Sequence, residues 1–217
     1  MKESYTHISV ILDRTGSMES IRNDTIGGFN TFLGEQKSQP SLATLTLVQF
    51  DTQDPYEVVH KFKPIQEVSP LTRETYVPRA STPLLDAMGR GINDLDACLA
   101  ALPDGEKPAR VVIVVVTDGQ ENSSHEFRKE QIVKMIKEKQ EKQNWQFVFL
   151  SADLKSIGDA REYGIAMDSS MAYLKNPDGT SSAWKSLSGR TSDYRSARRK
   201  NVSFTEEDRK KQEEGQQ

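Results

Sequence analysis

Short apolar runs alternate with stretches of helical spacing along this 217-residue chain. Runs and alternations of apolar residues, many of them β-branched, predict six strands. The strands are expected at 7–12, 41–50, 56–62, 110–117, 145–150 and 165–167. Apolar residues three or four positions apart predict helices between the strands. The helices are expected at 21–33, 83–99, 125–143 and 154–162.

The order of these elements predicts an α/β fold. Strands that alternate with helices favour a doubly wound, mostly parallel sheet with helices on both faces, a Rossmann-like arrangement. The continuous valine and isoleucine run at 110–117 is typical of a parallel strand that is buried on both faces. Only a short turn separates 41–50 from 56–62, which predicts a hairpin and one antiparallel strand at the sheet edge.

The character of the chain changes after Asp168. Residues 1–168 are predicted to form the folded domain, and residues 169–217 a polar C-terminal extension. Within the extension, spacing on one helix face predicts a single short helix. The residues that mark this face are Ala183, Trp184, Leu187, Thr191 and Tyr194. Residues 205–217 are nearly all charged or polar, which predicts a mobile tail.

Three residues in the predicted helices carry packing expectations. Gly27 and Gly28 each cost a helix up to about 1 kcal/mol relative to alanine, which favours close packing of this helix on the sheet. Cys98 lies among leucines and is expected in the core. A single cysteine forms no internal disulfide. Together with the lack of a signal-peptide pattern or a bilayer-length apolar run, it predicts a cytoplasmic protein.

The charge pattern does not favour a nucleic-acid or membrane partner. The formal net charge is −3, without the strong basic excess that such partners attract. Five basic residues gather between 190 and 200, but acidic residues follow at 206–208. We interpret this run as a solvated terminal helix, with an acidic partner or nucleic acid as the alternative. The run consists of Arg190, Arg195, Arg198, Arg199 and Lys200.

Three groups of oxygen-bearing side chains fall at one edge of the predicted sheet. Asp13, Thr15 and Ser17 directly follow the first strand, Thr82 precedes a helix, and Asp118 follows the valine-rich strand. Ligands of open α/β sheets bind beyond the carboxyl ends of the strands. Carboxylates and hydroxyls without imidazole or thiolate favour Mg²⁺, Mn²⁺ or Ca²⁺ over zinc and copper. These residues therefore predict a divalent-metal site.

In these motifs the chain resembles the von Willebrand factor A family. The metal-ion-dependent adhesion site of that family combines an Asp-x-Ser-x-Ser motif with a distant Thr and a distant Asp. Asp13, Thr15 and Ser17 match the first motif, Thr82 matches the lone Thr, and Asp118 matches the last Asp. Thr15 departs from the pattern, where Ser is usual, but it keeps the hydroxyl.

The resemblance implies a binding module and not an enzyme. In such a site the hydroxyls bind the metal directly and the aspartates bind it partly through water. A Glu or Asp of a protein partner then completes the coordination. A compact domain with no secretion signal and no receptor architecture suggests the cytoplasmic, bacterial or phage type of this family. Candidate partners are an AAA-type ATPase or a signalling protein, with no membrane or nucleic acid involved.

Two other functions stay open. A metal-dependent phosphohydrolase would use Asp13 as its nucleophile, but that class generally has a second acid two residues on, where this chain has Thr15. A structural or assembly protein would use the metal for stability alone. Asp13 and Asp118 also suit helix caps or turns, and a site that never holds metal is the remaining alternative.

The residues beside the predicted site receive simpler interpretations. Arg14 is expected to be an exposed loop residue, with a partner contact at the rim as the alternative. Gln120, Glu121 and Asn122 are expected to form a solvated loop, which can also influence the choice of partner.

Overall fold

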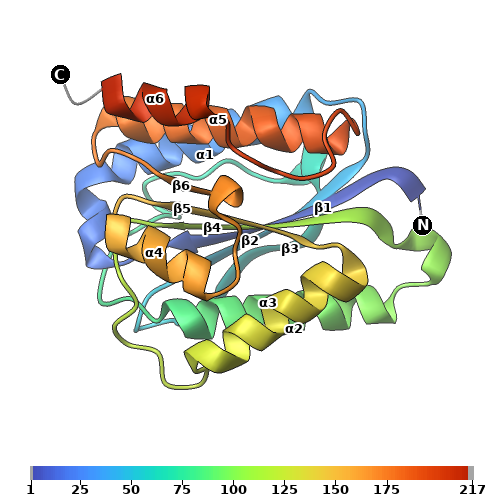
Figure 1. Ribbon diagram of the computed structural model, residues 1–217, viewed down its shortest axis with the longest axis horizontal. Coiled ribbons are helices and arrows are strands. Elements are labelled where there is room, and N and C mark those ends of the chain that lie inside the picture. The colour runs from blue at the N-terminus through green and yellow to red at the C-terminus, as the bar shows by residue number, and fades with distance from the viewer. Residues whose placement is uncertain (1, 215–217) are drawn as a thin grey trace.

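A six-stranded sheet forms the centre of the computed structural model, which describes residues 2–214 (Figure 1). The strand order is β3-β2-β1-β4-β5-β6; all neighbours pair in parallel except β2 and β3, which are antiparallel. This confirms the predicted α/β fold with one antiparallel edge strand. The strands are β1 (Lys2–Asp13), β2 (Ala43–Phe50), β3 (Glu57–Pro64), β4 (Pro108–Thr117), β5 (Gln146–Ser151) and β6 (Ser170–Ala172).

Helices cover both faces of this sheet (Figure 1). One face carries α1 (Arg22–Lys37) and α5 (Pro177–Arg195), with α6 (Glu206–Glu214) packed on α5. The other face carries α2 (Leu84–Ala101), α3 (Lys129–Gln143) and α4 (Leu154–Glu162). A 3₁₀ helix, η1 (Gly16–Ile21), joins β1 to α1. The sheet therefore separates two apolar cores.

The valine-rich strand β4 contributes side chains to both cores. Val112, Val114 and Val116 belong to the core beneath α1 and α5, whereas Val111 and Val115 belong to the core beneath α2 and α3. Successive side chains of a strand point to opposite faces, so a strand covered on both sides needs apolar residues at every position. This confirms the interpretation of the uninterrupted run.

Several element boundaries differ from the sequence prediction, and two of these differences have a clear physical cause. The last strand lies at Ser170–Ala172 and not at 165–167, because Met167–Ser169 forms a 3₁₀ turn and residues 170–172 pair with the end of β5. The charged helix begins at Lys129 and not at 125. The backbone amides of residues 125–127 donate to the carboxylate of Asp86 instead of starting the helix.

The segment predicted to be an extension supplies large parts of the fold. It contributes β6 to the sheet, and α5 is a 19-residue helix whose Trp184 and Leu187 are buried against α1. Helix α6 occupies much of the predicted mobile tail, of which residues 215–217 lie outside the described part. Whether residues 1–168 fold alone stays a prediction.

In the glycine pair of α1, Gly28 serves helix-to-helix packing and not the predicted helix-to-sheet packing. A Cβ on Gly28 would lie 2.1 Å from Cδ1 of Trp184 in α5, so only glycine fits there. A Cβ on Gly27 would have no such neighbour within 4 Å. Of these two glycines, only Gly28 is therefore needed for the close approach of α1 and α5.

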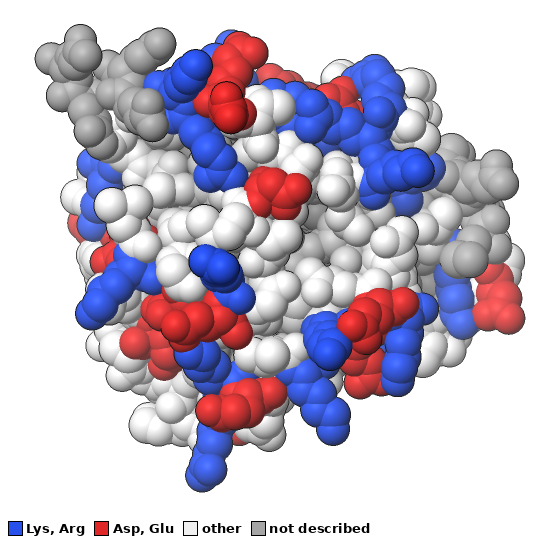
Figure 2. Space-filling view, viewed as in Figure 1, with Lys and Arg blue, Asp and Glu red and all other residues white. Residues whose placement is uncertain are grey.

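The basic run is only partly a solvated surface. Arg195 is 2% exposed, and its guanidinium donates to the carbonyls of Gln36 and Ser41. Arg190 pairs with Asp208 at 2.7 Å, and Arg198 pairs with Asp193 at 2.8 Å. Basic and acidic side chains are likewise interspersed over the face drawn in Figure 2. Much of the run is therefore matched by groups of the same chain.

Candidate metal centre

The predicted site lies where the strand order reverses. Strands β1 and β4 are neighbours with Leu12 opposite Val116, so Asp13 and Thr117 stand side by side at their carboxyl ends. From this point β2 and β3 extend the sheet one way, and β5 and β6 the other. Such a switch point is where open α/β sheets bind ligands, because the following loops diverge there.

Asp13 is fully buried at this point. Its Oδ1 accepts a hydrogen bond from the amide of Thr15 at 2.7 Å, and its Oδ2 accepts one from the hydroxyl of Thr117 at 2.5 Å. Burial raises the pKa of Asp13 to about 7, although these hydrogen bonds lower it, and nearby Asp118 raises it further. A cation placed here would favour the ionised carboxylate.

Thr15, Ser17 and Asp118 form a connected set of oxygens. The hydroxyls of Thr15 and Ser17 are 3.2 Å apart, and the Ser17 hydroxyl donates to Oδ1 of Asp118 at 2.6 Å. The other oxygen of Asp118 pairs with the ammonium of Lys175 at 2.6 Å. Ser17 is exposed while Asp13, Thr15 and Asp118 are buried, so the set opens to solvent at Ser17.

Thr82 joins the site through its backbone. Its amide donates to the side chain of Asn122 at 3.0 Å, and its carbonyl accepts from the Asn122 amide at 3.2 Å. Two residues earlier, the carbonyl of Ala80 accepts from the amide of Gly16 at 3.1 Å. The three predicted loops are thereby tied together, with the Thr82 side chain buried at 4% exposure.

Two carboxylates that were not predicted as ligands organise the loop after Asp118. Asp86 accepts from the amides of three successive residues, 125–127, at 2.8 to 2.9 Å. Glu121 accepts from the amides of Leu85, Ser123 and Ser124. The loop expected to be solvated is therefore held to the start of α2. No spacing in the sequence identifies the contacts of Asp86 with residues 125–127 or of Glu121 with Leu85, which join segments 36 to 41 residues apart.

Arg14 is buried, which corrects its interpretation as an exposed loop residue. It is 5% exposed, and its guanidinium donates to Asp51 at 2.9 Å and pairs with Glu57. Arg79 donates to the same Asp51 oxygen at 2.9 Å. The side chain of Arg14 thus braces β1 against the end of β2 and the start of β3, while its neighbours Asp13 and Thr15 belong to the candidate site.

Two tyrosines support the strand ends. The hydroxyl of Tyr76 donates to the carbonyl of Asp13 at 2.7 Å, and that of Tyr173 donates to the carbonyl of Thr117 at 3.1 Å. Burial raises the pKa of both phenols well above the usual value, so they stay neutral donors. Sequence reasoning missed both, because they reach the site from irregular segments.

The donor set fits a divalent cation of the hard-oxygen class. The oxygens of Asp13 and Asp118 supply up to two negative charges, and Thr15 and Ser17 add neutral hydroxyls. Within residues 2–214, no three His, Cys, Asp or Glu side chains gather as a metal-binding group. A metal held here therefore relies on hydroxyl and water ligands, which suits Mg²⁺ or Mn²⁺ better than zinc.

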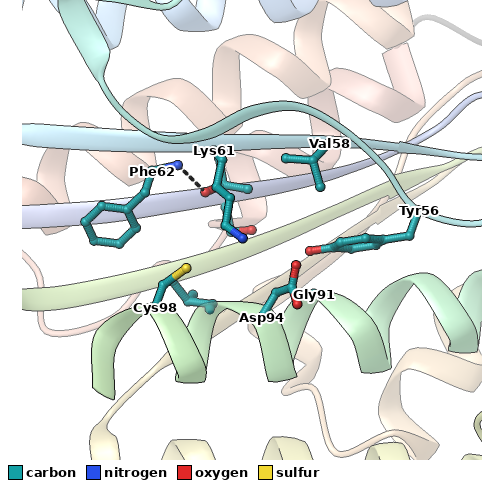
Figure 3. A pocket seen from close by; sticks show the side chains of 10 residues that line it. Tyr56, Val58, Lys61, Phe62, Gly91, Asp94 and Cys98 are labelled. Atoms are coloured by element: carbon teal, nitrogen blue, oxygen red, sulfur yellow. Dashed lines mark hydrogen bonds between the residues drawn. The ribbon is translucent and has the colours of Figure 1, made fainter. Parts of the chain in front are cut away.

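A small cavity lies elsewhere, between α2 and the β2-β3 edge of the sheet (Figure 3). Tyr56 points its hydroxyl toward Asp94 there, and Cys98 lines the wall (Figure 3). Its free volume of about 10 Å³ suffices for about one water molecule. Cys98 is partly exposed, contrary to the prediction that it is a core residue.

In the described part of the chain, no helix is long and apolar enough to cross a membrane.

Comparisons with known proteins give structural neighbours only. No protein-family profile matches the chain, and no curated protein matches its sequence. A crystal form of proximal thread matrix protein 1 from the mussel byssus matches with a TM-score of 0.56 and 14% identity. The match covers 88% of this chain and 47% of that one. The same mussel protein is also known with a zinc-occupied MIDAS motif, at 16% identity.

Two further neighbours carry related descriptions. A von Willebrand factor type A protein from Catenulispora acidiphila matches with a TM-score of 0.56 and 12% identity, over 87% of this chain and 43% of that one. The manganese-loaded TRAP protein of Plasmodium vivax matches with a TM-score of 0.54 and 14% identity, over 80% and 70%. The chain spans about half the length of the mussel protein. From these structural matches, the present chain has the fold of von Willebrand factor A domains.

Proposed function

We propose that this chain is a protein-binding module that engages an acidic residue of its partner through a divalent metal, Mg²⁺ or alternatively Mn²⁺ or Ca²⁺. The observation that carries the proposal is the connected oxygen set of Asp13, Thr15, Ser17 and Asp118 at the switch point of the sheet. Thr82, whose backbone ties the neighbouring loops, is proposed as the fifth ligand.

Each residue has a distinct part in this proposal. Asp13 and Asp118 offset the charge of the cation, and their buried positions hold them against rearrangement. Thr15, Ser17 and Thr82 contribute neutral oxygens. A metal with mostly neutral direct ligands keeps its affinity for an incoming carboxylate. Exposed Ser17 marks the side from which the partner approaches.

The descriptions of the neighbours agree with this proposal. Manganese is bound in the TRAP protein and zinc in the mussel protein, and another neighbour is the pilus adhesin SpaC of Lactobacillus rhamnosus GG. SpaC matches with a TM-score of 0.65 and 13% identity, over 89% of this chain and 30% of that one. These resemblances favour adhesion-type binding over catalysis. An AAA-type ATPase or a signalling protein as partner, and a cytoplasmic location, stay predictions.

The phosphohydrolase alternative is less well supported by the geometry. Both oxygens of Asp13 accept hydrogen bonds, from Thr15 and Thr117, which makes this carboxylate a positioned ligand more than a free nucleophile. The residue two positions on is Thr15, which offers no acid. Turnover of p-nitrophenyl phosphate by the wild-type protein, lost in Asp13→Ala, would favour this alternative.

Calorimetric titration with MgCl₂ and MnCl₂ tests the metal site directly. The wild-type chain is expected to bind one ion, and Asp13→Ala to lose this binding. Asp104→Ala is the matched control, because Asp104 has a side chain 95% exposed in a distant turn and should leave binding unchanged. Equal titrations of wild type and Asp13→Ala would overturn the site.

Partner capture then tests the bridge. Immobilised protein is incubated with lysate in Mg²⁺ or in chelator, with Asp13→Ala alongside. A partner kept only with metal and intact Asp13, and lost when its own contacting acid is neutralised, supports the proposal. A partner kept equally in all conditions contradicts the metal bridge. A metal that raises the melting temperature without changing partner binding would favour a structural role.

A further inference from the structure

An ammonium group of the chain itself stands at the candidate metal centre. Nζ of Lys175 lies 2.6 Å from Oδ2 of Asp118, whose side chain is fully buried. The remaining oxygen of Asp118 accepts from the Ser17 hydroxyl at 2.6 Å. Lys175 is thus the cation paired with a carboxylate that our proposed function assigns to a metal.

The loop that carries Lys175 is anchored on both sides. Before it, the amide of Tyr173 donates to the carbonyl of Ser151 at 2.9 Å, which continues the β5-β6 pairing. After it, the side chain of Asn176 accepts from the amide of Gly179 at 2.8 Å and caps α5. The backbone on both sides of Lys175 is therefore held by hydrogen bonds, which positions the Lys175 side chain to reach Asp118.

The residue before Lys175 is held from a third direction. The amide of Leu174 donates to the side chain of Gln212 in α6 at 3.1 Å. A Cβ on Gly179 would lie 2.5 Å from the Leu174 carbonyl oxygen, so the first turn of α5 packs directly on this loop. The C-terminal helices, which lie in the predicted extension, thus position the ammonium group of Lys175 at the candidate site.

We propose that Lys175 is a built-in cation that holds Asp118 in the metal-free protein and competes with a divalent metal for this carboxylate. The inference rests on the proposed metal site. One carboxylate oxygen cannot hold an ammonium and a divalent ion at contact distance without strong like-charge repulsion. The side chain of Lys175 is 36% exposed, so it has solvent into which it can move when a metal binds.

Competition of this kind sets a threshold for metal binding. The metal-free site is stabilised because the buried Asp118 keeps a counter-charge. Metal must release Lys175 before it gains Asp118, so its apparent affinity is lower than that of the same oxygens without the lysine. The released ammonium then becomes available beside the site.

Titration of the full chain with MnCl₂ tests the competition. Lys175→Met is expected to bind Mn²⁺ about tenfold or more tightly than wild type, since one like charge leaves the site. Lys175→Arg, which keeps the charge, is expected to stay near wild type. Lys155→Met, at an exposed position of α4, controls for the general loss of a positive charge.

Melting of the metal-free variants gives an independent readout. Lys175→Met is expected to melt below wild type in chelator, because Asp118 loses its counter-charge, and to gain more from added Mn²⁺. Equal Mn²⁺ affinities in wild type and Lys175→Met, with binding still lost in Asp13→Ala, would overturn this inference and leave the proposed function standing. Absence of Mn²⁺ binding in every variant would overturn both.

Discussion

The hydroxyl of Thr117 donates to Oδ2 of Asp13 at 2.5 Å and joins the ends of two strands that are 104 residues apart in sequence. This hydrogen bond orients a carboxylate that we assign to the metal. Groups that orient a ligand commonly change metal affinity by about 10- to 100-fold when removed. Thr117→Val is therefore expected to weaken Mn²⁺ binding by about tenfold in calorimetric titration.

Thr117→Ser is the matched control, because it keeps the hydroxyl and loses only a methyl group. It is expected to bind Mn²⁺ almost as well as wild type. A similar loss in both variants would show that packing around Thr117, and not its hydrogen bond to Asp13, supports the site.

The glycine pair of α1 offers a comparison of neighbouring positions. Gly28→Ala is expected to lower the unfolding free energy by about 1–3 kcal/mol, because its methyl group would overlap Trp184 in a packed core. Gly27→Ala is expected to raise it by up to about 1 kcal/mol, because the position is open and alanine favours the helix. Urea unfolding of both variants measures the difference. Equal effects would contradict the proposed close contact.

The cluster around Asp51 is expected to be costly to break. Asp51→Ala leaves the buried guanidinium of Arg14 without its main partner, so the unfolding free energy should fall by about 3 kcal/mol. Glu126→Ala breaks the exposed pair with Arg90 and should cost much less, because solvent already screens this pair. Urea unfolding of both variants measures the two losses in unfolding free energy. Losses of equal size would argue against a structural role for Asp51.

His7 predicts a pH dependence of stability. Its ring is buried against Phe62 at 4.3 Å, and burial lowers the pKa of His7 from 6.5 to about 3. Between these two values the unfolded chain binds a proton that the folded chain does not. The free energy of unfolding that neutral, buried His7 supports is therefore complete above pH 6.5. It is lost as the pH falls toward about 3, by up to about 1.4 kcal/mol per pH unit.

His7→Phe keeps the stacked ring and removes the titration. In metal-free urea unfolding from pH 7 to pH 4, wild type should lose stability more steeply than this variant. The difference between the two profiles isolates His7, since the other titrating groups are shared. Parallel profiles would show that His7 does not control the acid limb.

A truncation tests the predicted division of the chain. Residues 1–168 alone lack β6 and α5, and would expose Phe29 and Phe32 of α1 where Trp184 now packs. We expect this fragment to lose cooperative thermal unfolding, measured by circular dichroism. A chain ending at Phe204 keeps α5 and should unfold cooperatively. Cooperative melting of 1–168 near the full-length temperature would instead support the division.

The sequence predicted those elements whose signal is local. The valine run of β4 and the helical spacing of α2 and α4 are visible within each segment, because each element buries apolar residues at regular positions. Their positions in the chain therefore followed from the pattern. Helix α5 carries Ser and Gly at many positions, so the sequence predicted only a single short helix within a polar extension. It packs because Gly28 lets α1 approach, a contact across more than a hundred residues.

The candidate site divides in the same way. Asp13, Thr15, Ser17 and Asp118 lie in short motifs at strand ends, so a parallel sheet alone brings them together. Lys175 and Tyr76 lie in irregular segments with no motif. Their contacts depend on where distant chain segments return to the site, which no local pattern records.

The span between Ser17 and Asp118, 101 residues, has a consequence for how the chain folds. Contacts of such separation form only after a large loss of chain entropy, so parallel pairing of β1 with β4 is intrinsically slow. The unfolded chain keeps these oxygens far apart and offers a cation no comparable site. A ligand of the assembled site therefore acts on the finished fold, where it stabilises the native state by mass action. Occupancy of the centre would then mark chains that have completed their sheet.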